Sequence, residues 1–195
     1  MTKTRLEAFS DGVIAIIITI MVLELKIPHS TNWVDIKPLF PVLISYVISF
    51  IMIGIYWGNH HHLLHAVTDV NSKMIWANLH LLFWLSLVPF ATAWMGETNF
   101  DKVTVAVYAV LLDCCGIAYS ILLNMIIKNH SHSPVLLIPL KKQAKKGMLS
   151  ALIYTLAIPA AFIHPIISGI LYLAVAILWW WPDRNIEKSL EEHRK

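Results

Sequence analysis

The chain has 195 residues, of which 57% are hydrophobic and only 14% are charged, and its formal net charge is +3. A soluble domain usually carries about 25% charged residues, so this composition excludes an ordinary water-soluble core. The apolar residues form continuous runs rather than alternating with period two, which excludes a transmembrane β-barrel. Runs of this kind predict helices that cross a membrane, each of which needs about 20 apolar residues.

Six apolar runs follow one another along the chain, separated by short polar and basic segments. Pro89 lies near the end of the third run, and a very tight turn is predicted at His164-Pro165, between the last two. We therefore predict an all-α polytopic membrane protein in which residues 1–182 form a six-span transmembrane domain and residues 183–195 form a cytoplasmic tail. The predicted spans cover about 8–26, 39–58, 74–94, 103–127, 147–163 and 166–182.

The basic residues predict the orientation of these spans. If the N-terminus lies inside the cell, the outer segments hold only Lys26, Lys37 and Lys102. The inner segments then hold Lys3, Arg5, Lys73, Lys128, Lys141, Lys142, Lys145, Lys146, Arg184, Lys188, Arg194 and Lys195. The positive-inside rule therefore predicts that both termini lie in the cytoplasm. We expect the protein in the plasma membrane. We interpret the lysines of segment 141–146 as a topology signal and an anchor for anionic lipid head groups, not as a nucleic-acid site.

The first span carries more polar residues than contact with lipid requires. Charged groups such as Glu7 and Asp11 are costly at membrane depth and normally face protein or water. One interpretation is that Ser10 or Asp11 simply caps the helix, where the helix dipole favours a carboxylate.

One face of the first span forms a continuous stripe, since Gly12, Ile16, Thr19 and Leu23 follow one another at helical spacing. Such a stripe is suited to line a pore. The alternative is that the Thr19 hydroxyl bonds its own backbone and that the isoleucines face lipid.

The first span also carries a recognisable motif, Arg5-x3-Phe9-Ser10-Asp11-Gly12, followed by Thr19 and Leu23-Glu24-Leu25. With weaker matches at Trp57-x2-His60-His61 and Asn78-Leu-His80, this pattern resembles the signature of the transmembrane protein 175 family. That family comprises the endosomal and lysosomal potassium channels and their prokaryotic relatives. The resemblance covers nearly the whole chain, which has one six-span unit, as the prokaryotic members have.

This resemblance implies a homotetramer in which the first helix of each subunit lines a central pore. The pore-lining positions of the family fall on Ile16, Thr19, Ile20 and Leu23. The signature residues Arg5, Phe9, Ser10 and Asp11 are expected to hold the first span against neighbouring helices, and His80 is the expected partner by position.

The residues available to such a pore predict its chemistry. The chain lacks the Thr-Val-Gly-Tyr-Gly filter of ordinary potassium channels, so selection by a rigid ring of carbonyl groups is not expected. Rings of Ile16, Ile20 and Leu23 predict a hydrophobic gate that excludes water. Rings of Thr19 hydroxyls predict a modest preference for potassium over sodium, with other monovalent cations also permeant. Carboxylates at Asp11 and Glu24 would favour cations over anions, and no cofactor is expected.

Two other constellations suggest a different function. In the segment His60–His65, His61 and His65 stand at i,i+4, a spacing that suits a transition metal. Asp113 lies in the middle of the fourth span, where an acid is a candidate functional group. An acid in this place could equally bond a neighbouring helix or face a subunit interface. A proton-coupled or metal-ion transporter using either feature is the alternative to a channel. No arrangement of nucleophile, base and acid points to an enzyme.

Overall fold

A computed structural model of the chain describes residues 2–27, 32–67, 69–129 and 134–180. The described residues are almost entirely helical and contain no strand, so the predicted all-α fold is confirmed. The predicted tail at 183–195 lies outside the described residues. The elements, in order, are α1 (Lys3–Leu23), α2 (Trp33–Ile36), the 3-10 helix η1 (Lys37–Leu39), α3 (Phe40–His65), α4 (Ser72–Ser86), α5 (Val88–Glu97), α6 (Lys102–Asn129), α7 (Pro134–Ile163) and α8 (Pro165–Trp180).

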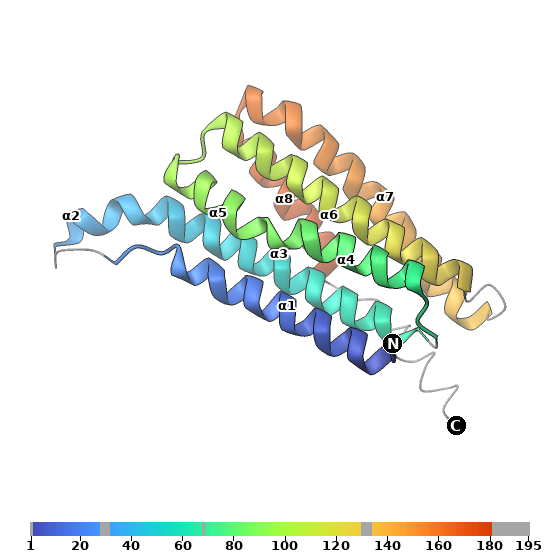
Figure 1. Ribbon diagram of the computed structural model, residues 1–195. Coiled ribbons are helices and arrows are strands. Elements are labelled where there is room, and N and C mark those ends of the chain that lie inside the picture. The colour runs from blue at the N-terminus through green and yellow to red at the C-terminus, as the bar shows by residue number, and fades with distance from the viewer. Residues whose placement is uncertain (1, 28–31, 68, 130–133, 181–195) are drawn as a thin grey trace.

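The long helices run side by side in one bundle (Figure 1). Helix α1 lies at one edge of the bundle, beside α3. Helices α6 and α7 lie toward the opposite side, and α4 and α5 lie between these two groups. In the part of the chain that the structure describes, five helices or helix pairs are long and apolar enough to cross a membrane, and α8 is a shorter apolar helix of 16 residues. Only His164 separates α7 from α8, as the tight turn predicted there requires.

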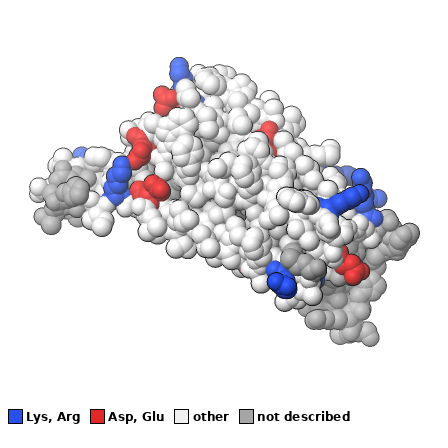
Figure 2. Space-filling view, viewed as in Figure 1, with Lys and Arg blue, Asp and Glu red and all other residues white. Residues whose placement is uncertain are grey.

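Charged side chains gather toward the two ends of the bundle, and the band between them is almost entirely uncharged (Figure 2). Many large apolar side chains in this band are exposed, among them Ile170 and Phe162. A soluble protein would bury these side chains, whereas hydrocarbon chains of a bilayer cover them at no cost.

The structure departs from the predicted spans at several helices. Helix α1 begins at Lys3 rather than near residue 8, and α3 continues to His65 rather than ending near residue 58. The third span is broken into α4 and α5 at Leu87, because Pro89 has no backbone N–H to donate to the carbonyl of Leu85. Helix α7 begins at Pro134 rather than near residue 147 and has 30 residues. A helix of that length spans about 45 Å, more than the hydrocarbon core of about 30 Å, so its lysine-bearing part extends beyond the bilayer.

The α3–α5 contact depends on Gly96. A Cβ atom at this position would lie 2.5 Å from Ser45 Oγ and 2.7 Å from the Cα atom of Val42. We expect Gly96→Ala to lower the free energy of unfolding by about 1–3 kcal/mol, because α3 must move away. The measurement is the melting temperature of the purified protein in detergent. Gly169→Ala is the control, since no heavy atom lies within 4 Å of its added Cβ, and equal melting temperatures for the two variants would contradict the prediction.

Candidate pore helix and its anchor

Helix α1 has one buried face and one exposed face. The buried face packs on α3, α4 and α5 and consists of Leu6, Ser10, Ile14, Ile17 and Met21. The opposite face contains the whole predicted stripe, in which the exposed fraction is 59% for Ile16 and 76% for Leu23, and Gly12 and Thr19 are also exposed. Ile20, the third predicted gate residue, is 43% exposed. No other described part of the same chain covers this face, so it can line a pore, contact another copy of the chain or meet lipid.

The Thr19 hydroxyl donates a hydrogen bond of 2.8 Å to the carbonyl oxygen of Ala15, one turn earlier in α1. This is the backbone bond that the alternative interpretation of Thr19 anticipates. It uses the only proton of the hydroxyl, while the oxygen keeps lone pairs directed away from the helix. The residue therefore presents an acceptor, not a donor, on the exposed face.

A buried chain of hydrogen bonds joins α1 to α3 and α4. The Asn78 side-chain amide donates to Ser10 Oγ over 2.9 Å, and its carbonyl oxygen lies 2.7 Å from Nε2 of His60. All three side chains are buried. Interhelical bonds of this kind are a main source of helix association in membranes, where apolar packing brings little net gain over lipid.

The direction of each hydrogen bond between Ser10, Asn78 and His60 follows from the bond that Ser10 makes within α1. Ser10 gives its only proton to the carbonyl oxygen of Leu6, at 2.8 Å, so it can only accept from Asn78. Asn78 must then turn its amide nitrogen toward Ser10 and its oxygen toward His60. Nε2 of His60 therefore carries a proton, and in the neutral ring Nδ1 has a lone pair. That Nδ1 atom is buried and has no hydrogen-bond partner among the described residues.

Two further contacts tie the same half of α1 to α3. The indole N–H of Trp57 donates to a carboxylate oxygen of Asp11 over 2.9 Å. The ammonium group of Lys3 donates to the backbone carbonyl of His65 over 2.7 Å and lies 3.9 Å from Glu7. The first half of α1 is thus held by polar contacts, as charged groups at this depth require.

The signature residues do not all join this network. His80 is exposed, and its Nε2 accepts from the indole of Trp84 within α4, over 2.9 Å. Asn78, two residues earlier, occupies the place beside Ser10 that the sequence pattern suggested for His80. Arg5 and Phe9 are exposed, and neither makes a side-chain hydrogen bond or ring contact with another residue that the structure describes.

The other end of α1 borders a groove of about 730 Å³ between α1 and α5. Ile16 and Ile20 line it from α1, Phe90 and Trp94 line it from α5, and Glu24 and Glu97 stand at its end. The Glu97 carboxylate accepts from Lys26 over 2.5 Å and raises the pKa of that lysine through the hydrogen bond and its charge. Since both side chains of this pair are exposed, it contributes little to stability.

The histidine segment does not assemble a full metal site among the described residues, where no three His, Cys, Asp or Glu side chains come close enough to hold an ion. His61 and His65 lie together on α3, with ring centroids 4.6 Å apart. His60 turns away into the hydrogen-bond chain.

Asp113 pairs with α7. One of its carboxylate oxygens accepts from the Thr155 hydroxyl over 3.0 Å, and the other is buried without a hydrogen-bond partner among the described residues. This contact joins α6 to α7, far from α1 in the bundle (Figure 1). A polar bond between two spans is one of the roles that the sequence left open for Asp113.

Asn78 and Trp57 hold α1 against its neighbours, a role that the sequence did not predict for either residue. Asn78 is a strongly polar residue within an apolar run, a signal that points to an interhelical partner. Trp57 lies near the end of a predicted span, where an interfacial role was the simpler explanation.

Comparisons with known proteins place this architecture in a family. The pattern of the family described as "Endosomal/lysosomal potassium channel TMEM175" matches residues 5–89. A protein named a potassium channel from Chryseobacterium sp. (strain P1-3) is 49% identical over 193 residues, which cover 99% of this chain and 100% of the relative. Another named potassium channel, from Streptomyces collinus, is 31% identical over 169 residues, 82% of each chain.

A solved structure agrees with these sequence relatives. The crystal structure of a lysosomal potassium-selective channel TMEM175 homolog from Chamaesiphon minutus superimposes with a TM-score of 0.76 at 26% identity. The similarity covers 91% of this chain and 95% of that one. The helical bundle is thus that of a multi-pass membrane channel, not of an enzyme. The chain belongs to the TMEM175 family.

A double-mutant cycle tests whether Asn78, rather than His80, anchors Ser10. We expect Ser10→Ala and Asn78→Ala to be coupled by about 0.6 kcal/mol, the mean for interhelical hydrogen bonds in membranes. Ser10→Ala and His80→Ala should not be coupled, because the His80 ring contacts Trp84 instead. The measurement is the free energy of unfolding in mixed micelles for the single and double variants. Equal coupling in the two cycles would contradict this assignment.

Proposed function

We propose that four copies of this chain surround a common axis and conduct potassium ions along a path lined by α1. The observation that carries the proposal is the two-faced character of α1, whose polar anchor holds one side while its stripe remains exposed at the edge of the bundle. One helix per chain cannot enclose a pore, so the proposal requires an oligomer. The names of the relatives support potassium as the permeant ion.

The gate in this proposal is hydrophobic. Rings of Ile16, Ile20 and Leu23 from four subunits would narrow the path with side chains that cannot coordinate an ion. All three are exposed in the single subunit, and Ile16 and Ile20 also face the groove beside α5. Closure then needs no plug, because a narrow apolar path loses its water.

Selectivity in this proposal comes from Thr19. Its hydroxyl proton is donated to Ala15, so four hydroxyl oxygens would offer lone pairs to a cation at the same level of the pore. A thin ring of this kind lacks the stacked carbonyl groups of a long filter, which is why we propose only a modest preference for potassium over sodium.

We further propose that residues 1–182 form the six-span channel domain and that residues 183–195 form a cytoplasmic tail, with both termini inside the cell. The distribution of basic residues supports this orientation. Arg5 and Phe9, exposed near the start of α1, would then contact a neighbouring subunit on the cytoplasmic side.

Ion flux from proteoliposomes tests the proposal. We expect potassium to pass faster than sodium, down a gradient of either sign, and no flux of a small anion. Thr19→Val should bring the potassium and sodium rates closer together, while Thr19→Ser, which keeps the hydroxyl, should preserve the difference. A flux that saturates and depends on a proton gradient would indicate a transporter. Unchanged selectivity in Thr19→Val would remove Thr19 from the filter.

Polar substitution tests the gate. We expect Ile16→Asn to raise the resting potassium leak by about tenfold, which corresponds to a barrier lowered by about 1.4 kcal/mol, because the amide keeps water in the constriction. Ile170→Asn is the matched control, since Ile16 and Ile170 are both 59% exposed in the single subunit but lie on different helices. The measurement is the leak current in planar bilayers. A leak that rises equally in both variants would reject a gate at Ile16.

A further inference from the structure

A second groove, of about 350 Å³, runs along the outward face of the bundle between α3 and α8. Phe50, Ile51 and Ile55 line it from α3, and Trp179 and Trp180 line it from the end of α8. Phe50 and Trp180 are also exposed at its rim, 44% and 60% respectively. The groove is therefore open to the surroundings of the protein, and α1 does not contribute to it.

Two glycines form the floor of this groove. Gly54 and Gly58 stand at i,i+4 on one face of α3, and an added Cβ at either position would meet no heavy atom within 4 Å. Gly96, by contrast, lies directly against α3, so its missing side chain serves helix packing. Gly54 and Gly58 leave a space that the subunit itself does not fill.

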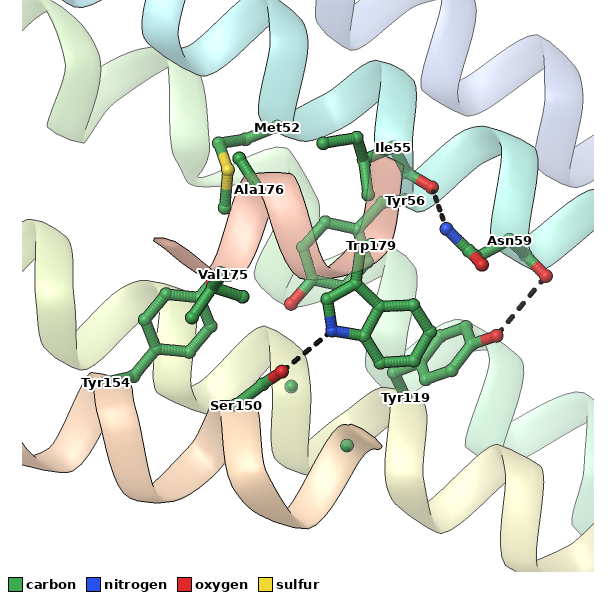
Figure 3. A pocket seen from close by; sticks show the side chains of 12 residues that line it. Met52, Ile55, Tyr56, Asn59, Tyr119, Ser150, Tyr154, Val175, Ala176 and Trp179 are labelled. Carbon is green, nitrogen blue, oxygen red and sulfur yellow. Dashed lines mark hydrogen bonds between the residues drawn. The ribbon is translucent and has the colours of Figure 1, made fainter. Parts of the chain in front are cut away.

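A positive charge lies beside Trp179, one of the residues that line the groove. The ammonium group of Lys146 lies 5.9 Å from the centroid of the Trp179 ring. The indole N–H of Trp179 donates to Ser150 over 2.7 Å (Figure 3). The same helix, α7, carries Lys141, Lys142 and Lys145, all exposed. An apolar groove with a cation beside Trp179 complements an amphiphile that has a hydrocarbon tail and an anionic head group.

The wall behind Trp179 is apolar as well. A cavity of about 30 Å³ lies between α3, α6, α7 and α8, and it shares Ile55, Asn59 and Trp179 with the groove (Figure 3). The surface of this cavity is almost entirely apolar, because the polar groups of Asn59, Tyr119 and Ser150 that line it are engaged in hydrogen bonds. Trp179 therefore has apolar surroundings on the side of the cavity as well.

We propose that this groove is a binding site for an anionic glycerophospholipid. One acyl chain lies over Gly54 and Gly58, and the phosphate of the head group pairs with Lys146 beside Trp179. The charge at one end distinguishes this occupant from a neutral lipid, since each lysine near an anionic head group adds attraction that a zwitterionic head group does not offer. Helix α1, the proposed pore helix, contributes no residue to this site.

Native mass spectrometry of the delipidated full-length protein tests the site, with phosphatidylglycerol and phosphatidylcholine added separately. We expect more phosphatidylglycerol than phosphatidylcholine to be retained. Lys146→Gln should lower the occupancy of phosphatidylglycerol about fivefold, the effect of one lysine near a charged membrane surface. The double variant Gly54→Leu/Gly58→Leu should lower the occupancy of both lipids, because its side chains fill the groove.

Two matched controls separate the site from general effects of charge and volume. Lys128→Gln removes a lysine at the end of α6, away from Trp179, and Gly169→Leu fills an equally open glycine position outside the groove. Both should retain phosphatidylglycerol as the wild type does. Melting temperatures verify that each variant is folded, and Lys146→Gln tests the site alone if the leucine variant does not fold.

Four results would overturn the proposal. Equal retention of the two lipids by the wild type would remove the role of Lys146, as would an unchanged occupancy in Lys146→Gln. Unchanged occupancy in the folded leucine variant would place the lipid elsewhere. Dissociation of the oligomer by the leucine substitutions would identify the groove as a contact between copies of the chain.

Discussion

The hydrogen-bond chain from Ser10 through Asn78 to His60 sets the rotation of α1 about its own axis. In a bilayer core, no water replaces a lost partner, so a buried donor such as the Asn78 amide needs its acceptor within the protein. Advancing α1 by one residue would turn it about 100° and carry Ser10 away from Asn78. The bonds that hold one face of α1 inward therefore also determine that Ile16, Thr19 and Leu23 lie on the exposed face.

Hydropathy and helical period were sufficient to predict the bundle and the stripe on α1, but not the partner of Ser10. Asn78 and His80 both belong to the weakly matching stretch in the third span, and two residues on a helix point about 200° apart. Only the phase of α4 decides between them. That phase is poorly encoded, because apolar residues cover both faces of the helix and lipid accepts any of them.

Helix ends were harder to predict than helix positions, for a related reason. An apolar run marks only the part of a helix that lies in the bilayer. Helix α7 begins earlier, at Pro134, and includes a lysine-rich segment before its apolar run. Helical hydrogen bonding does not stop where hydrocarbon stops. Any association between copies of the chain would leave still less trace in the sequence, because an exposed isoleucine suits lipid, a neighbouring helix or a closed pore equally well.

The anchors of α1 are unevenly distributed along its length. Its first half is held by Lys3, Ser10 and Asp11 through polar contacts, whereas Ile17 and Met21 in the second half make only apolar ones. Lipid tails replace apolar contacts at little cost, so the second half, which carries Ile20 and Leu23, resists displacement less. Helix α3 takes part both in the anchoring of α1 and in the groove on the outside of the bundle. Its His60 bonds to Asn78, and its Gly58, two residues earlier, lines the groove. A lipid that favoured one position of α3 over another would bias the position of α1 by at most the same free-energy difference.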